Sequence, residues 1–150
     1  EGIMSIFDSF SINASGLTAE RYRMDVISEN IAIIDTTRTA DGSTYRRKLV
    51  TFEEKGKNGT FASALAKAKG DYIGGGVRVG KTYEDTETEM KMVYDPSHPD
   101  ADENGYVTYP NVNVITEMTD LIDASRSYEA NATAFSTSKS MAVKGLEMAQ

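Results

Sequence analysis

The 150-residue chain has no cysteine and a single histidine. The absence of cysteine excludes disulfides and thiolate metal sites, although it leaves the cellular compartment open. The only histidine, His98, lies between two prolines and has no second histidine or cysteine with which to share a metal. A packing role is therefore the default for His98, and we expect no metal and no cofactor.

The chain also lacks long hydrophobic runs, an excess of positive charge and any recognisable catalytic set. No stretch approaches 18 consecutive apolar residues, so no transmembrane helix is expected. A net charge of −7 argues against nucleic acid as a partner, because binding to a phosphate backbone needs clustered Lys and Arg. Without a Ser-His-Asp set, a thiol or a carboxylate pair placed in a cleft, we expect neither enzymatic activity nor a small-molecule substrate.

What the chain does contain is a sevenfold apolar repeat in its last third, which predicts a helix over residues 111–150. About 38 helical residues would span about 57 Å, more than the core of a 150-residue chain can cover, so other subunits are expected to cover the rest. Charged side chains beside the repeat, Glu117 and Asp120 among them, are expected to set the choice of neighbour. The expected C-terminal assembly seam comprises Val114, Met118, Leu121, Tyr128, Ala132, Phe135, Ala142 and Leu146.

A second sevenfold stripe predicts an N-terminal helix over residues 4–34. Gly16 weakens this helix, and Ser15–Gly16 is a candidate kink. Taken alone, the stripe also fits an ordinary amphipathic core helix. Residues 1–3 precede Met4, which reads as a natural start, so they are expected to be an addition. The expected N-terminal assembly seam comprises Phe10, Leu17, Met24, Ile27, Ile31 and Ile34.

Residues 35–110 are predicted to form a connector, a mobile Gly-rich loop and a small β-rich module. The expected strands cover residues 45–52, 77–83, 86–94 and 106–109, with the second and third joined as a hairpin at Glu84–Asp85 and with Arg46–Lys48 as a solvated strand edge. The loop covers residues 53–76, and Asn111 or Asn113 is expected to cap the C-terminal helix. The predicted fold class is α+β, with the two terminal helices forming a coiled-coil-like pair.

An acidic turn before the last strand offers an alternative function. Asp100, Asp102, Asn104 and Gly105 match positions one, three, five and six of an EF-hand calcium loop, but Asn111 stands where a bidentate Glu is required. The favoured interpretation is a turn in which Asp and Asn side chains bond backbone amides and Gly105 supplies a positive φ. A calcium-responsive coiled-coil adaptor using residues 100–105 is kept as the alternative.

Several blocks of the sequence resemble one family over nearly the whole chain. These blocks are residues 15–21, 24–32, 94–101, 105–107, 109–113 and 124–131. They are similar to the family of bacterial flagellar basal-body rod protein C, a proximal-rod member of the flagellar rod and hook axial proteins. The family motif residues are Asn30, Ile31, Ala32, Asp95, Pro96, His98, Pro99, Pro110 and Asn111.

The resemblance implies a structural subunit of the flagellar rod, the drive shaft that transmits torque from the rotor to the hook. Its implied partners are other rod proteins, further copies of itself, the rotor-ring or rod-base components and the flagellar type III export apparatus. The implied location is the periplasmic rod of the basal body, reached without a cleaved signal peptide. One departure is Ile33, where the family motif has Asn; since a β-branched residue disfavours the left-handed conformation that ends many helices, we expect this helix to continue past Ile33.

Overall fold

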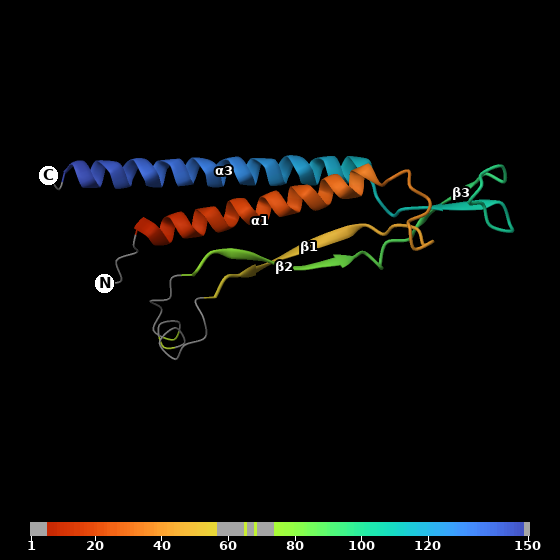
Figure 1. Ribbon diagram of the computed structural model, residues 1–150, viewed down its shortest axis with the longest axis horizontal. Helices are drawn as coiled ribbons and strands as arrows, with labels where there is room; N and C mark the ends of the chain where they lie inside the picture. The colour runs from red at the N-terminus through yellow and green to blue at the C-terminus, as the bar shows by residue number, and fades with distance from the viewer. Residues whose placement is uncertain (1–5, 57–64, 66–67, 69–73, 149–150) are drawn as a thin grey trace. The chain divides into compact units, whose positions relative to one another are not determined.

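The computed structural model describes residues 6–56, 65, 68 and 74–148, with side chains from residue 8 onward in the first helix. It has an α+β fold with two helices and two small antiparallel sheets in the described part of the chain. The elements, all but β4 labelled in Figure 1, are α1 (Ile6–Ala32), β1 (Lys48–Glu54), β2 (Val77–Glu84), β3 (Lys91–Tyr94), β4 (Tyr106–Tyr109) and α3 (Val114–Glu147). The fold class predicted from the sequence is confirmed at this level.

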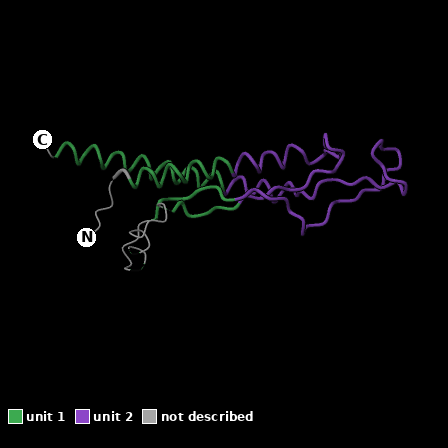
Figure 2. Tube along the Cα trace, turned by 60° about the horizontal axis from the view of Figure 1, so that its bottom comes forward, with its two compact units in different colours: residues 1–22, 51–80, 124–150 green, residues 23–50, 81–123 purple. Residues whose placement is uncertain are grey.

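The chain divides into two compact units, which Figure 2 colours separately. Unit 1 comprises residues 1–22, 51–80 and 124–150, and unit 2 comprises residues 23–50 and 81–123. Each unit therefore takes one part of α1 and one part of α3. Both helices are continuous, so the spacing of residues along each is fixed by helical geometry.

In unit 1, α1 and α3 lie side by side and run in opposite directions. The rings of Phe10 and Phe135 are 5.1 Å apart between centroids, at an interplanar angle of 58°. A Cβ built on Gly16 would lie 3.0 Å from the side chain of Asn131, so the absence of a side chain at Gly16 allows the helices to approach closely. The α1 helix runs through Ser15 and Gly16 without interruption.

The first sheet pairs β1 with β2 and is anchored to α1. The amide of Lys55 donates to the carbonyl of Gly76 at 2.8 Å, and the amide of Val77 donates to Ser15 Oγ at 3.0 Å. Gly76 has a φ of +100°, and a Cβ there would collide with Ser15. This glycine is therefore required both by its backbone conformation and by the contact with α1.

In unit 2, β3 and β4 form an antiparallel hairpin whose buried side chain is Val107. Val93 pairs with Val107 and Tyr94 with Tyr106, and the two tyrosine rings are 5.2 Å apart. The connection between the strands turns at Gly105, whose φ of +81° confirms the expected positive value. Asn113 Oδ1 then accepts the amides of Ile115 and Thr116, so Asn113 is the N-cap of α3.

Two expectations about the elements are wrong. The hairpin of residues 77–94 does not form, because β2 pairs with β1 while β3 pairs with β4. Asp85 turns the chain between β2 and β3: its Oδ1 accepts the amides of Glu87 and Thr88, so those residues do not extend β3. The predicted mobile loop falls mostly on residues 57–73, which, apart from Leu65 and Ala68, lie outside the described residues.

The other wrong expectation concerns the end of α1, which is at Ala32 and not beyond Ile33. The amide of Ile33 still donates to Glu29 O, but those of Ile34 and Thr36 donate only three residues back, to Ile31 O and Ile33 O. The helix thus ends by tightening its last turns, without a left-handed residue, since every positive φ in the described chain belongs to a glycine. A β-branched residue at position 33 is compatible with this kind of end.

Candidate functional site

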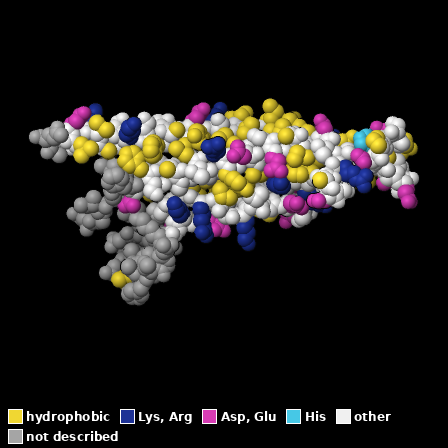
Figure 3. Space-filling view, in the orientation of Figure 1, with side chains coloured by type: hydrophobic (Ala, Val, Ile, Leu, Met, Phe, Trp, Pro, Cys, Tyr) yellow, Lys and Arg dark blue, Asp and Glu magenta, His cyan; other side chains and the backbone are white. Residues whose placement is uncertain are grey.

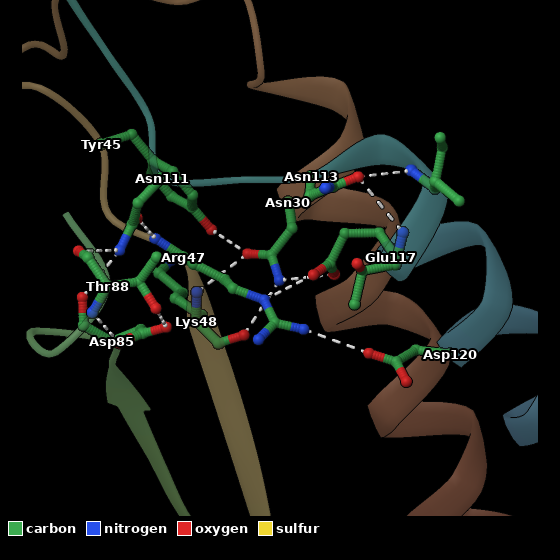
Figure 4. A network of polar contacts seen from close by, with 12 residues as sticks. Asn30, Tyr45, Arg47, Lys48, Asp85, Thr88, Asn111, Asn113, Glu117 and Asp120 are labelled. Carbon is green, nitrogen blue, oxygen red and sulfur yellow. Dashed lines mark hydrogen bonds and ion pairs between the residues drawn. The ribbon is translucent and has the colours of Figure 1, made fainter. Parts of the chain in front are cut away.

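A cluster of buried polar side chains in unit 2 joins the end of α1, the start of β1 and the start of α3 (Figure 4). Its central residue is Asn30, which is 1% exposed. Asn30 Oδ1 accepts hydrogen bonds from the Tyr45 hydroxyl and the Lys48 amide, both at 2.9 Å. Asn30 Nδ2 donates to the Lys48 carbonyl at 2.9 Å and to Glu117 Oε2 at 3.0 Å.

These four hydrogen bonds use the full donor capacity of the Asn30 amide and both lone pairs of its oxygen. Two of them go to the backbone of Lys48, so the side chain bonds β1 as a neighbouring strand would. Only the carboxamides of Asn and Gln offer both two donors and two acceptors in one plane, and Asn is the shorter of the two. The structure therefore gives a physical reason for Asn at this position of the family motif.

A second motif residue, Asn111, has the same kind of role at the junction before α3. Its Oδ1 accepts the amide of Arg47 at 2.8 Å, and its Nδ2 donates to the carbonyls of Asp85 and Thr88 at 2.9 and 3.1 Å. Asn111 is thus buried between β1 and the turn after β2. It does not cap α3, which leaves that role to Asn113 alone.

Glu117 and Arg47 form the charged part of the cluster. Glu117 is 0% exposed, and its Oε1 accepts a hydrogen bond from Arg47 Nε. Arg47 also donates to Asp120 Oδ2 at 3.1 Å. Glu117 was expected to set the choice of neighbour, and Arg47 was expected to lie on a solvated strand edge. Both expectations are wrong, because the two side chains form an ion pair with each other within the chain. The sequence pattern could not show this, since the two residues are 70 positions apart.

Tyr45 closes the cluster on the side of β1. Its hydroxyl donates to Asn30, and Lys48 Nζ lies 5.3 Å from its ring centroid while pairing with Glu29. Burial, followed by the negative charge of Glu29, raises the pKa of Tyr45 above its ordinary value of 10.0. The phenol is therefore held in its neutral, donating form.

Four further motif residues, Asp95, Pro96, His98 and Pro99, lie in the connection between β3 and β4, whereas Ile31 and Ala32 are the last two residues of α1. Asp95 Oδ1 accepts the amide and the hydroxyl of Ser97, and these bonds lower the pKa of Asp95 below its ordinary value. His98 Nδ1 accepts the amide of Asp100, so His98 has the structural role expected of it. Pro110, which follows β4, is almost fully buried.

The carboxylates of the acidic turn bond to different partners. Asp102 Oδ1 accepts the amides of Asn104 and Tyr106, whereas Asp100 bonds Thr37 and Arg38. Among the described residues, no group of three or more His, Cys, Asp or Glu is placed to hold a metal ion. Nor is any helix in the described part of the chain long and apolar enough to cross a membrane.

The structure separates the expected C-terminal seam into inward and outward positions. Leu121, Tyr128, Phe135 and Ala142 are half-buried. The best buried residues of α3, Glu117 and Ala124, lie three residues after the repeat positions Val114 and Leu121. Of the expected positions four residues after the repeat, Met118 and Leu146 are 54% and 71% exposed, whereas Ala132 is half-buried. Hydrophobic side chains accordingly reach the surface over α3 in Figure 3.

The expected N-terminal seam lies closer to the core. Ile27 is buried, and the other described members, Phe10, Leu17, Met24, Ile31 and Ile34, are half-buried. Ile34 lies in the turn that follows α1. The best buried residues of α1 that the seven-residue pattern missed are Ala19, Val26 and Asn30.

A family model and individual relatives both match this chain to flagellar basal-body rod proteins. The family described as flagellar basal body rod FlgEFG protein C-terminal matches residues 103–148, which include β4 and α3. The chain is 45% identical to the flagellar basal-body rod protein FlgC of Bacillus subtilis over 151 residues, which cover 97% of this chain and 99% of the relative. It is 44% identical to the FlgC protein of Borreliella burgdorferi over 98% of this chain and 99% of the relative.

A FlgC protein of Escherichia coli is 37% identical over 98% of this chain and 100% of its own length. The terminal helices, the small β module and these matches define the class of flagellar basal-body rod proteins. Within that class, the chain belongs to the FlgC family. None of this supports the calcium-responsive adaptor.

Proposed function

We propose that this chain is a structural subunit of the bacterial flagellar basal-body rod, which it builds together with other rod proteins and further copies of itself. The observation that carries this proposal is the match to FlgC proteins over nearly the full length of both chains. In the cluster around Asn30 and Asn111 the buried polar side chains are hydrogen-bonded to one another and to the backbone, as expected of a structural cluster.

The two helices form a coiled-coil-like pair in this proposal. The contacts of Phe10 with Phe135 and of Gly16 with Asn131 support antiparallel packing, and the inward residues of α3 alternate at spacings of three and four. The polar cluster at Asn30 then fixes which turn of α1 faces which turn of α3. A single polar contact inside an apolar seam is a known way to set the register of paired helices.

Assembly uses the apolar side chains that the helix pair leaves exposed. Ile115, Met118 and Ile122 lie at spacings of three and four on α3, and they are 77%, 54% and 53% exposed. Three large apolar side chains on one face are typical of a surface that is covered in a larger assembly. Val114 and Leu146, two members of the expected C-terminal seam, are also exposed.

The export route, the cellular location and the further partners are proposed from the family resemblance. We propose that the chain is exported by the flagellar type III apparatus and joins the proximal rod in the periplasm. There it would contact rod-base components and transmit torque to the structures beyond. The role is mechanical, and no catalytic step is part of it.

The test replaces Met118 by Asp in cells that carry this chain as their only copy. Because Met118 is exposed, the purified variant is expected to keep the helix content and urea midpoint of the parent chain, while cells lose motility and basal bodies lack a rod. Met118→Leu, which keeps an apolar surface, is the matched control and should swim normally. Normal motility with Met118→Asp would oppose this contact surface, and absence of the parent chain from purified basal bodies would refute the proposed function.

A further inference from the structure

The exposed residues of α1 form one narrow stripe. From residue 8 to the end of the helix, seven of the eight exposed side chains are spaced alternately by three and four residues, and Tyr22 is the eighth. This is the spacing of a coiled-coil seam, but it faces away from the packed side of the helix. We call six of these residues the outer seam of α1: Ala14, Thr18, Arg21, Asp25, Ser28 and Ala32.

The α3 helix exposes a wider face, and this face contains a stripe with the same alternation. We call six of its residues the outer seam of α3: Thr119, Ile122, Arg126, Glu129, Thr133 and Ser136. All six are exposed. Each helix thus has one seam used inside the chain and a second seam that the chain leaves uncovered.

We propose that the outer seam of α1 in one copy packs antiparallel on the outer seam of α3 in a second copy, with Asp25 opposite Arg126 and Arg21 opposite Glu129. This inference rests on the proposed function, because it names the partner and the register of the contact through which rod subunits meet. The two surfaces differ, so each copy can use both at once, and the contact can continue from copy to copy.

Charge order selects this register. Aligning Asp25 with Arg126 in antiparallel helices brings Arg21 to Glu129, and the same alignment places Ser28 at Ile122. Sliding either helix by one heptad moves both acids away from both arginines. A parallel alignment that keeps Asp25 at Arg126 brings Arg21 to Ile122 and leaves Glu129 unmatched. Only one arrangement pairs all four charges.

The four charges are also available for this contact. In the part of the chain that the structure describes, the side chains of Arg21, Asp25, Arg126 and Glu129 form neither an ion pair nor a hydrogen bond, and all four are exposed. The shapes fit as well, because most residues of the α1 seam are small and admit a close approach by Ile122 of the second copy.

Charge reversal tests the register. Asp25→Arg and Arg126→Asp each place two like charges together and are expected to reduce incorporation into basal bodies roughly tenfold or more, whereas the double variant restores it. Asp123→Arg reverses an exposed acid of α3 that lies off the outer seam, so it is the control and should assemble normally. Since all these sites are exposed, helix content and urea midpoints of the purified chains should be unchanged.

Cysteine pairing identifies the partner, because the chain contains no cysteine of its own. In the variant Ser28→Cys with Ile122→Cys, oxidation of purified basal bodies should give a ladder of disulfide-linked copies, whereas Asn104→Cys with Ile122→Cys should not.

A crosslink to a different protein, a crosslink within one copy, or failure of the double charge variant to recover would overturn the inference. If the parent chain and Asp25→Arg assemble equally well, this register is refuted while the proposed function stands. Absence of the parent chain from basal bodies would refute the proposed function itself.

Discussion

Replacing Asn30 by Asp tests whether the buried polar cluster holds the two helices together. The substitution keeps the volume and retains the oxygen that accepts from Tyr45 and Lys48. It removes the two donors, however, so that a carboxylate oxygen faces the Lys48 carbonyl at 2.9 Å and Glu117 Oε2 at 3.0 Å. Both partners are acceptors, and Glu117 is fully buried.

The expected loss in the free energy of unfolding is about 3–4 kcal/mol at pH 7. Two lost hydrogen bonds contribute about 1 kcal/mol each, and the uncompensated partners and like charges supply the rest. The neighbouring Glu117 also raises the pKa of the new carboxyl. The folded state then binds its proton more tightly, so the destabilisation should become smaller as the pH falls from 7 to 5.

Urea denaturation followed by circular dichroism at 222 nm measures this loss at both pH values. Asn104→Asp makes the same chemical change at an exposed position and should cost no more than about 0.5 kcal/mol. A loss for Asn30→Asp below about 1 kcal/mol at pH 7, or one that does not shrink at pH 5, would refute the reasoning.

Three further predictions concern single contacts. Arg47→Met leaves Glu117 buried without its cation and should cost about 3–5 kcal/mol in urea denaturation, whereas Arg78→Met, at an exposed ion pair, should cost less than about 1 kcal/mol. Gly16→Ala brings a Cβ to 3.0 Å from Asn131 and should be less stable than Gly145→Ala, which meets nothing within 4 Å, by about 1 kcal/mol or more; equal thermal midpoints would contradict the close helix approach. The folded state favours the neutral phenol of Tyr45, so this group should not change the free energy of unfolding below pH 10 and should lower it as the pH rises above 10. In the variant Tyr45→Phe, the part of this alkaline loss that is due to Tyr45 should disappear.

The β module shows which features of the fold the local sequence pattern predicts and which it does not. The sequence predicted β4 with its correct bounds, because turn residues flank a short run of strand formers. It paired β2 with the wrong strand, since pairing depends on contacts distant in sequence: Asn111 binds the carbonyls of Asp85 and Thr88 and fixes the turn that separates β2 from β3. No local pattern indicates which distant amide will occupy that turn.

The candidate site divides in the same way. Asn30 and Asn111 could be singled out from the sequence through the family resemblance, but their hydrogen-bond partners could not. Arg47 and Glu117 looked like ordinary surface charges by their positions in a strand and a helix, and only the tertiary structure brings them together inside the chain.

By itself, the sequence determined the presence of the two terminal helices, the presence of the small β module and the family, because these depend on periodicity, turn residues and motifs that are local in the chain. The tertiary structure decided which helix faces are covered and which remain free. A repeat of seven marks a face as apolar, but its burial depends on what packs against it. For that reason Ala124 is fully buried while Met118, on the same helix, is open to a neighbour.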